Sequence, residues 1–438
     1  METSSQNPGT FISLLDKGKL FIKGVVIFFM ALGLWIPTLF INSIINERSA
    51  RQKDAINDIS NKWASRQSVT GPLLWVPYFE EIKDNKGGIE TVKRSAWFMP
   101  DKMKAFADIK PEKRHRSIYQ VAVYRSDITI SGLFNPLGWE TLNIPSDKML
   151  WKEAKLVFSV SDHARGINED VYLVWDGTRI LCNPLSSGET AMGEALAAPL
   201  PDMETGALKQ HSFSLQFSLN GSQELLFKAG ARETNITMAS GWKDPSFTGI
   251  KLPDERTVSD SGFTASWKYM NRTVPMVWKD HYNDLGDVSF GAALIIPVDG
   301  YDKTERSVKY ALLCIVLTFA AFFLIESIYK KPLHLIQYGL AGLALVLFYT
   351  LLLSISEYLG FNLAYLIAGT ATIGLVAWFV GGIMKSARLA TFIGFVLTVV
   401  YGYIFTIIQL QDFALLMGSL GLFVALAIIM YFSRKLQW

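Results

Sequence analysis

Five apolar segments follow one another over the last third of the chain, and nearly all charges in this region lie in the short gaps between them. Each segment has about the 17 to 25 residues that a helix needs to cross the hydrocarbon core of a bilayer. The segments are 310–328, 335–354, 360–383, 389–410 and 413–432. This pattern predicts a multi-pass α-helical membrane protein.

The sign of the charges alternates from one gap to the next. Since Lys and Arg are retained on the cytoplasmic side, the basic gaps are expected to face the cytoplasm and the acidic gaps the opposite side. In chain order the charged residues are Lys330 and Lys331, Glu357, Lys385 and Arg388, Asp412, and finally Arg434 and Lys435. This order predicts that the tail 433–438 is cytoplasmic.

A sixth apolar segment, 25–45, lies near the start of the chain and is preceded by Lys17, Lys19 and Lys23. The basic residues predict that residues 1–24 stay in the cytoplasm. A cleaved signal peptide is the competing interpretation, but its apolar region is usually only about 7 to 15 residues long, and no Ala-x-Ala-like site follows here. We therefore predict an uncleaved anchor, bent at Pro37.

Both ends of the middle segment, 46–306, are then expected on the outer side of the membrane. About 260 residues are enough for a domain with its own core. Its 32 Lys plus Arg against 34 Asp plus Glu give no basic surface for nucleic acid. Its one cysteine, Cys182, cannot pair with Cys314, which lies in a span, so we expect no disulfide within the chain.

The middle segment begins with 46–67, where apolar residues at helical spacing predict an amphipathic helix. Strand signals follow. Residues 211–219 alternate strictly and reach Asn220-Gly221 before 225–227, which predicts a hairpin. A second hairpin is predicted at 171–182, around Asp176-Gly177. Further strands are expected at 118–130, 154–160, 263–269 and 288–296, and the whole favours an antiparallel sandwich-like domain.

Signatures of phosphate binding, zinc proteolysis, elbow-type hydrolysis and Cys pairs are absent from the sequence. The histidines are too far apart in sequence to suggest a local metal site. We expect no enzyme, metal or cofactor. The densest polar string, 161–166, contains Asp162, His163 and Arg165; it is either an acid/base cluster or, more simply, a turn in which the aspartate and arginine pair.

Charged residues in or beside the spans are further candidates. Glu326 lies near one end of its span and has Lys330 at i+4, which favours an ion pair over a proton or ion pathway. Glu357 is expected in a hydrated turn. The junctions between the middle segment and the spans carry charges that could pair with one another or contact headgroups; they are Glu47, Arg48, Arg51, Arg306 and Lys309.

Short strings over nearly the whole chain match, in the same order, those of a known family. They are Glu47-Arg48 with Arg51, Gly71-Pro72-Leu73 with Pro77, Ser126-Asp127-Ile128-Thr129, Asp162 to Ile167, Gly241-Trp242 with Pro245-Ser246-Phe247, Ser259 with Ser261-Gly262-Phe263 and Trp267, Asp299 with Tyr301, Arg306 to Ala311, Leu333-His334 with Gln337-Tyr338, and Ser356-Glu357 with Gly360-Phe361. With the order of one span, a large middle segment and five spans, they resemble the CreD family of inner-membrane proteins.

The resemblance implies a bacterial inner-membrane protein linked to cell-envelope integrity, often encoded with a two-component system and associated with envelope-stress or β-lactam responses. It supplies no catalytic residue. One departure is His163, which separates Asp162 from Ala164-Arg165-Gly166, whereas the family runs the aspartate directly into that string. The extra residue weakens the expectation that Asp162 and Arg165 share a fixed geometry.

We therefore expect a non-enzymatic protein with six transmembrane helices and a periplasmic β-rich domain that contacts the lipid bilayer and an envelope or cell-wall protein. One alternative is a transporter or lipid-handling protein that uses Glu326 and the last three spans. Another is a periplasmic carbohydrate-active enzyme that uses Asp162, His163 and Arg165, with exposed Trp rings to bind sugar.

Overall fold

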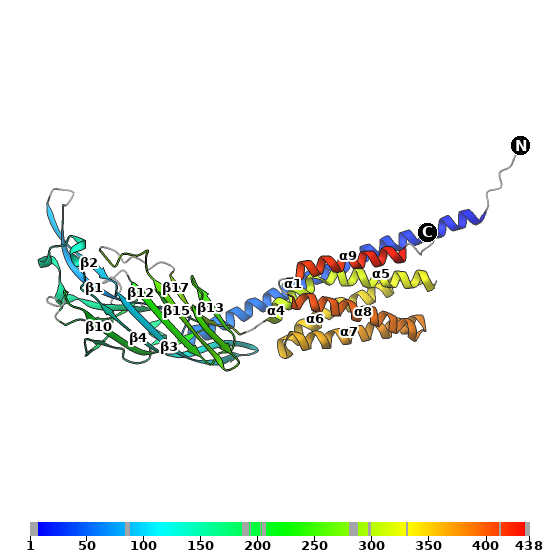
Figure 1. Ribbon diagram of the computed structural model, residues 1–438. Coiled ribbons are helices and arrows are strands. Elements are labelled where there is room, and N and C mark those ends of the chain that lie inside the picture. The colour runs from blue at the N-terminus through cyan, green and yellow to red at the C-terminus, as the bar shows by residue number, and fades with distance from the viewer. Residues whose placement is uncertain are drawn as a thin grey trace. The chain divides into compact units, whose positions relative to one another are not determined.

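The computed structural model describes residues 8–83, 88–185, 192, 194–201, 203, 207–279, 288–296, 299–329, 332–410 and 413–433. Contacts divide the chain into two compact units (Figure 1). A helical unit consists of Met1–Gln52 and Val298–Trp438, and a β unit consists of Lys53–Pro297.

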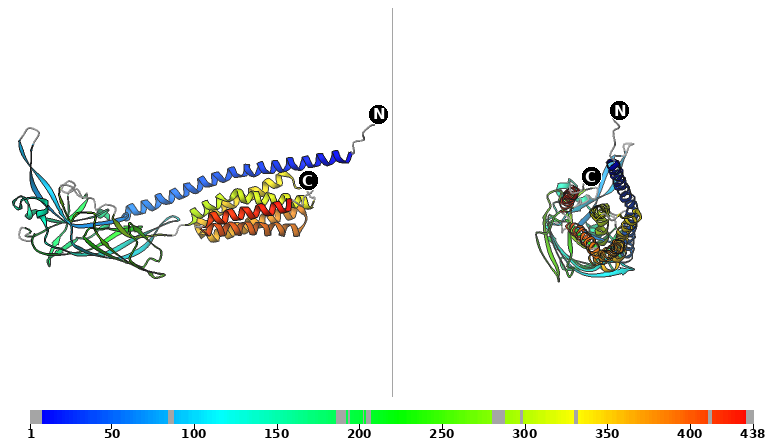
Figure 2. Two further views of the ribbon diagram at one scale, coloured as in Figure 1. Left: turned by 45° about the horizontal axis from the view of Figure 1, so that its top comes forward. Right: turned by 90° about the vertical axis from the view of Figure 1, so that its right-hand side faces the viewer.

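Helix α1, Pro8–Trp63, is the only described element that belongs to both units. It is one uninterrupted helix (Figure 2), and Pro37 does not end it. The sequence predicted a span at 25–45 and an amphipathic helix at 46–67; the structure joins the two and ends the helix at Trp63. The last residues of the predicted helix instead form a short link and the first residue of the next strand.

The rest of the helical unit consists of α4 (Asp299–Lys309), α5 (Ala311–Tyr329), α6 (Leu335–Leu359), α7 (Phe361–Met384), α8 (Ala387–Gln409) and α9 (Ala414–Ser433). Among the described residues, four helices are long and apolar enough to cross a membrane, namely Ile22–Trp63, α6, α7 and α8. The bent pair formed by α4 and α5, with an angle of 44°, raises the number to five. Helices occupy all six predicted spans, and the crossing of all six stays a prediction.

Helix α4 lies where the sequence predicts the end of the β-rich segment 46–306, so this helix was not predicted. The structure ends the β unit at Pro297 instead. Residues 299–309 form a helix because Tyr301, Thr304 and Val308 recur every three or four residues and are buried on one face. Charged residues lie between these buried positions, on the other face of the helix. The stretch has no long apolar run, so its helical spacing is hard to recognise from the sequence.

The β unit contains two sheets (Figure 1). The first runs β13-β17-β11-β1-β5-β9-β8, with β2 beside β1 and β16 beside β2. The second runs β14-β15-β12-β3-β4-β10-β6-β7. In chain order the strands are β1 Gln67–Lys83, β2 Ile89–Phe98, β3 Lys102–Arg116, β4 Tyr119–Phe134, β5 Lys155–Val160, β6 Tyr172–Trp175, β7 Thr178–Leu181, β8 Asn183–Leu185, β9 Ala195–Pro199, β10 His211–Ser222, β11 Glu224–Lys228, β12 Glu233–Ser240, β13 Pro245–Gly249, β14 Glu255–Ser259, β15 Gly262–Met270, β16 Val277–Lys279 and β17 Ser289–Leu294.

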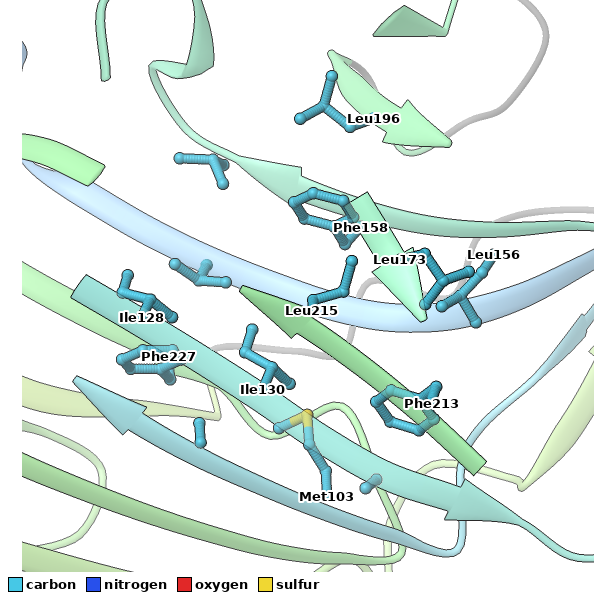
Figure 3. Close-up of a cluster of buried hydrophobic side chains, with 14 of the residues drawn as sticks. Met103, Ile128, Ile130, Leu156, Phe158, Leu173, Leu196, Phe213, Leu215 and Phe227 are labelled. Carbon is cyan, nitrogen blue, oxygen red and sulfur yellow. The ribbon is translucent and has the colours of Figure 1, made fainter. Parts of the chain in front are cut away.

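The two sheets share one hydrophobic core. Figure 3 shows Ile130 of β4, Phe213 of β10 and Phe158 of β5 within it, and the first two come from the second sheet while the third comes from the first. Alternation along each strand supplies these side chains, because every second residue points to the same face. Most pairings are antiparallel, as predicted, but β1 with β11 and β3 with β12 are parallel.

The predicted hairpin at 211–227 is wrong, because β10 and β11 belong to different sheets. Asn220-Gly221 is not a turn but continues β10, where Gly221 lies opposite Tyr124 of β4. A Cβ at Gly221 would overlap the Tyr124 ring, so the glycine serves a close approach. The second predicted hairpin is confirmed as β6 and β7, joined by Asp176 and Gly177 with positive φ.

Candidate functional site

Glu326, at the end of α5, is the most buried carboxylate of the helical unit among the described residues. It forms an ion pair with Lys23 of α1 and accepts a 2.9 Å hydrogen bond from the Tyr338 hydroxyl of α6. Lys23 also donates to the Leu333 carbonyl oxygen at 2.6 Å. The expected partner, Lys330, lies outside the described residues; the partner that the structure shows is 303 residues away in sequence.

This Glu326 cluster (Lys23, Glu326, Leu333 and Tyr338) satisfies the charges that it contains. Phe319 and Phe322 meet the Tyr338 ring edge to face, with centroids 5.5 and 5.7 Å away, and cover it with apolar surface. A buried charge is tolerated when it is paired and hydrogen-bonded. The arrangement therefore fastens α1 to α5 and α6, and it gives no specific support to an ion pathway.

The prediction that Glu357 lies in a hydrated turn is wrong, because α6 extends to Leu359 and the Glu357 carboxylate contacts both α4 and α1. It accepts a 2.8 Å hydrogen bond from the Tyr301 hydroxyl, and the Arg48 Nε lies 3.8 Å from the same oxygen. The Glu357 side chain is only 10% exposed, whereas that of Arg48 is 43% exposed. We call Arg48, Tyr301 and Glu357 the Glu357 cluster.

For the other predicted junction residues, the described part of the chain shows no ion pair from one junction to the other. Glu47 and Arg51 pair with each other along α1 at 2.6 Å, and Lys309 pairs with Glu305 along α4 at 2.9 Å. Arg306 is half-buried and has no recorded partner among the described residues. Arg48 is thus the one predicted junction charge that the described contacts connect to another helix, and its partner is Glu357.

The two clusters hold α1 at widely separated points. From Lys23 to Arg48 a helix rises about 37 Å, slightly more than the roughly 30 Å of a bilayer core. Between them, a Cβ at Gly342 of α6 would overlap Leu34 of α1, so that glycine allows the two helices to approach closely. This spacing places the polar contacts near the two ends of an apolar stretch that is long enough to cross a membrane, where charged groups would cost least.

In the β unit, Asp162 is buried and both oxygens of its carboxylate accept hydrogen bonds. It accepts hydrogen bonds from the Ser65 backbone at 3.0 Å, from the Ser65 hydroxyl at 2.9 Å and from the Arg165 Nε at 3.0 Å. Burial raises the pKa of Asp162, but the hydrogen bonds from Ser65 and Arg165 outweigh it, so the pKa lies below its ordinary value.

The Asp162 cluster (Ser65, Asp162 and Arg165) fixes the end of α1 to the sheets. Arg165 also donates to the backbone carbonyl of Asn61 in the last turn of α1, a group without a partner inside the helix. The short helix α2, His163–Gly166, puts Asp162 and Arg165 at i and i+3. The extra residue His163 therefore does not separate them, contrary to expectation.

An acid/base site around Asp162 gains no support from these contacts. His163 faces Glu194 at 3.5 Å and makes no recorded contact with the Asp162 carboxylate. None of the nine Trp side chains of the β unit is exposed, and seven are buried, so they form core instead of a sugar-binding surface. Among the described residues no three His, Cys, Asp or Glu side chains could hold a metal ion.

Sequence reasoning missed Lys23, Tyr301 and Tyr338. Lys23 was read only as a topology signal, and the two tyrosines carry no local pattern that marks them as hydrogen-bond donors to a carboxylate. The usable signal was Glu326 itself, because a carboxylate inside an apolar segment requires a partner.

An apolar helical bundle linked by one long helix to a two-sheet domain defines a membrane protein with a large β-rich domain. A family model described as "Inner membrane protein CreD" matches residues 19–438. The Escherichia coli (strain K12) protein "Inner membrane protein CreD" is 32% identical over 434 residues, which cover 96% of this chain and 94% of that protein. The chain belongs to the CreD family and is an inner-membrane protein.

Proposed function

We propose that this chain is a non-enzymatic inner-membrane protein that supports cell-envelope integrity through partner contacts of its β unit. The proposal rests on the contacts that hold α1 in place in both units. The helix is held by the Glu326 and Glu357 clusters in the helical unit and by the Asp162 cluster in the β unit. A continuous helix anchored in both units is suited to hold an interaction domain on a membrane base.

The proposed topology has six crossings, cytoplasmic termini and an extracytoplasmic β unit. It rests on the alternating charges of the gaps. We test it with single cysteines and a membrane-impermeant maleimide in intact cells, since Cys182 and Cys314 are both buried. An exposed cysteine at Lys209→Cys should react in intact cells, and the matched variant Lys385→Cys should react only after permeabilisation. The reverse pattern would refute the topology.

The envelope role is tested by crosslinking in living cells. A photoreactive residue is placed at exposed apolar positions of the β unit, such as Leu208 and Leu252, and at Trp378 of α7 as the control in the bundle. Capture of a discrete envelope or wall component by the β unit, but not by Trp378, supports the proposal. Capture of lipid alone, at the bundle, instead favours lipid handling.

Lipid handling is the second candidate function, because α5, α8 and α9 enclose an apolar groove. The transport and carbohydrate-enzyme alternatives have no comparable observation. Glu326 and Asp162, the residues on which they depended, are engaged in anchoring contacts.

A further inference from the structure

A groove of about 570 Å³ runs between α5, α8 and α9. Its walls include Leu317 and Ala321 of α5, Val396 of α8, and Leu420 and Val424 of α9. Among the described residues that line it, the only polar side-chain groups are the hydroxyls of two tyrosines, one on α5 and one on α8. A site with this lining recognises hydrocarbon, because it would leave most polar groups of a ligand unpaired.

Tyr403 of α8 is one of the residues that line the groove. Its ring packs against Gly421 of α9, where a Cβ would overlap it, and its hydroxyl donates to the Met417 carbonyl oxygen. These contacts fix the first half of α9 against α8 and occupy one of the two hydroxyls. Beyond them the groove continues along α5 as far as Tyr329, whose side chain is 56% exposed.

The length and width of the groove indicate which kind of ligand fits into it. Its lining extends on α5 from Leu313 to Tyr329, and 16 residues of helix span about 24 Å. The 570 Å³ is the space open to the centres of water-sized spheres, and spread over about 24 Å it has a cross-section of about 24 Å². Adding the roughly 1.4 Å radius of such a sphere on each side gives a groove about 8 Å wide. A helix with side chains is about 10–12 Å wide and does not fit. A single hydrocarbon chain does, because carbon atoms in contact lie about 4 Å apart.

We propose that this groove is a binding site for one acyl chain of a membrane phospholipid. The chain lies along α5 with its methyl end against Tyr403 and its headgroup beyond Tyr329, where an exposed aromatic ring suits the membrane interface. One leaflet supplies only about 15 Å of hydrocarbon depth, so the chain reaches past the midplane. In the topology proposed above, the lipid comes from the cytoplasmic leaflet. The site itself does not depend on the envelope function.

Native mass spectrometry of the full-length protein in mild detergent tests the site. We expect one phospholipid to stay bound per chain, and Ala321→Phe, which fills the groove, to reduce that occupancy at least tenfold. The matched control is Ala371→Phe, on an exposed position of α7 outside the groove, which should retain the lipid. A lysophospholipid, with one acyl chain, should refill the wild-type site.

A second filling variant, Val396→Phe, approaches from the opposite wall and keeps the test valid if Ala321→Phe does not fold. The proposal is overturned if the wild type retains no phospholipid, if both filling variants retain as much as Ala371→Phe, or if the lysophospholipid fails to bind. Each of these results leaves the crosslinking of the β unit unaffected, so failure of the lipid site and failure of the envelope function can be told apart.

Discussion

Removing either member of the buried Lys23–Glu326 ion pair should destabilise the helical unit. The relevant variants are Glu326→Gln and Lys23→Met, singly and together. Glu326→Gln removes the negative charge opposite the Lys23 ammonium, which keeps the Leu333 carbonyl and the Tyr338 ring as uncharged neighbours. Lys23→Met leaves the Glu326 carboxylate without a positive partner among the described residues, and with the Tyr338 hydroxyl as its hydrogen-bond donor. Each single change therefore strands a charge in largely apolar surroundings.

The size of the effect follows from burial. Breaking a fully buried pair by removing one partner costs about 3–5 kcal/mol. The Lys23 and Glu326 side chains are 20% and 10% exposed, and each keeps one hydrogen bond, so we expect about 2–4 kcal/mol for each single variant. Removing both charges together eliminates the stranded charge, so the double variant should lose about 1–3 kcal/mol less than the sum of the single losses.

Denaturant unfolding of the purified full chain in detergent, followed by circular dichroism, measures these free energies. The control is the exposed pair Glu305–Lys309 on α4, whose disruption should cost less than about 0.5 kcal/mol. Single variants as stable as this control, or a double variant whose loss equals the sum, would refute the view that the Glu326 cluster anchors α1.

Three further predictions concern other sites and use the same unfolding measurement. Because the folded pKa of Asp162 is lowered, its contribution is complete above the unfolded value of about 3.9 and is lost as the pH falls below it; Asp162→Asn should weaken this acid dependence, and an unchanged pH profile would contradict it. Gly221→Ala should cost about 1–3 kcal/mol by displacing Tyr124, whereas Gly241→Ala, with no neighbouring atom closer than 3.9 Å, should cost little. The Tyr349 hydroxyl is buried with no hydrogen-bond partner among the described residues, so Tyr349→Phe should raise the free energy of unfolding by about 1 kcal/mol; a loss of stability would show that the hydroxyl is satisfied.

The apolar segments and the alternating strands could be predicted because their signals are local. A run of about 20 apolar residues partitions into a membrane as a helix whatever its neighbours are. In β10, Phe213, Leu215 and Phe217 alternate with polar residues, so the strand carries its buried face in its own sequence. The β6–β7 hairpin was found for the same reason, because Asp176-Gly177 favours a two-residue turn by itself.

Predictions from local sequence were wrong where contacts with distant parts of the chain determine the role of a residue. Asn220-Gly221 has the composition of a turn, but its glycine is required by the Tyr124 ring on a neighbouring strand. The charged helix α4 was missed because its buried face contains Tyr301 and Thr304 instead of a run of large aliphatic residues. In both cases the deciding contact comes from a distant part of the chain.

The sequence by itself determined which long segments are apolar helices, part of the strands, that Glu326 needed a partner, and that Asp162 could pair with Arg165, whereas it predicted a hydrated turn for Glu357. Only the tertiary structure decided the remaining partners, which are Lys23 for Glu326, Arg48 with Tyr301 for Glu357, and Ser65 for Asp162. The physical reason is that burying a charge costs free energy because the charge leaves water. A charged residue within an apolar segment can be recognised from the sequence alone. Its compensation depends on which atoms the folded chain brings within about 3 Å, and residues up to 303 positions apart share no pattern that a single sequence displays.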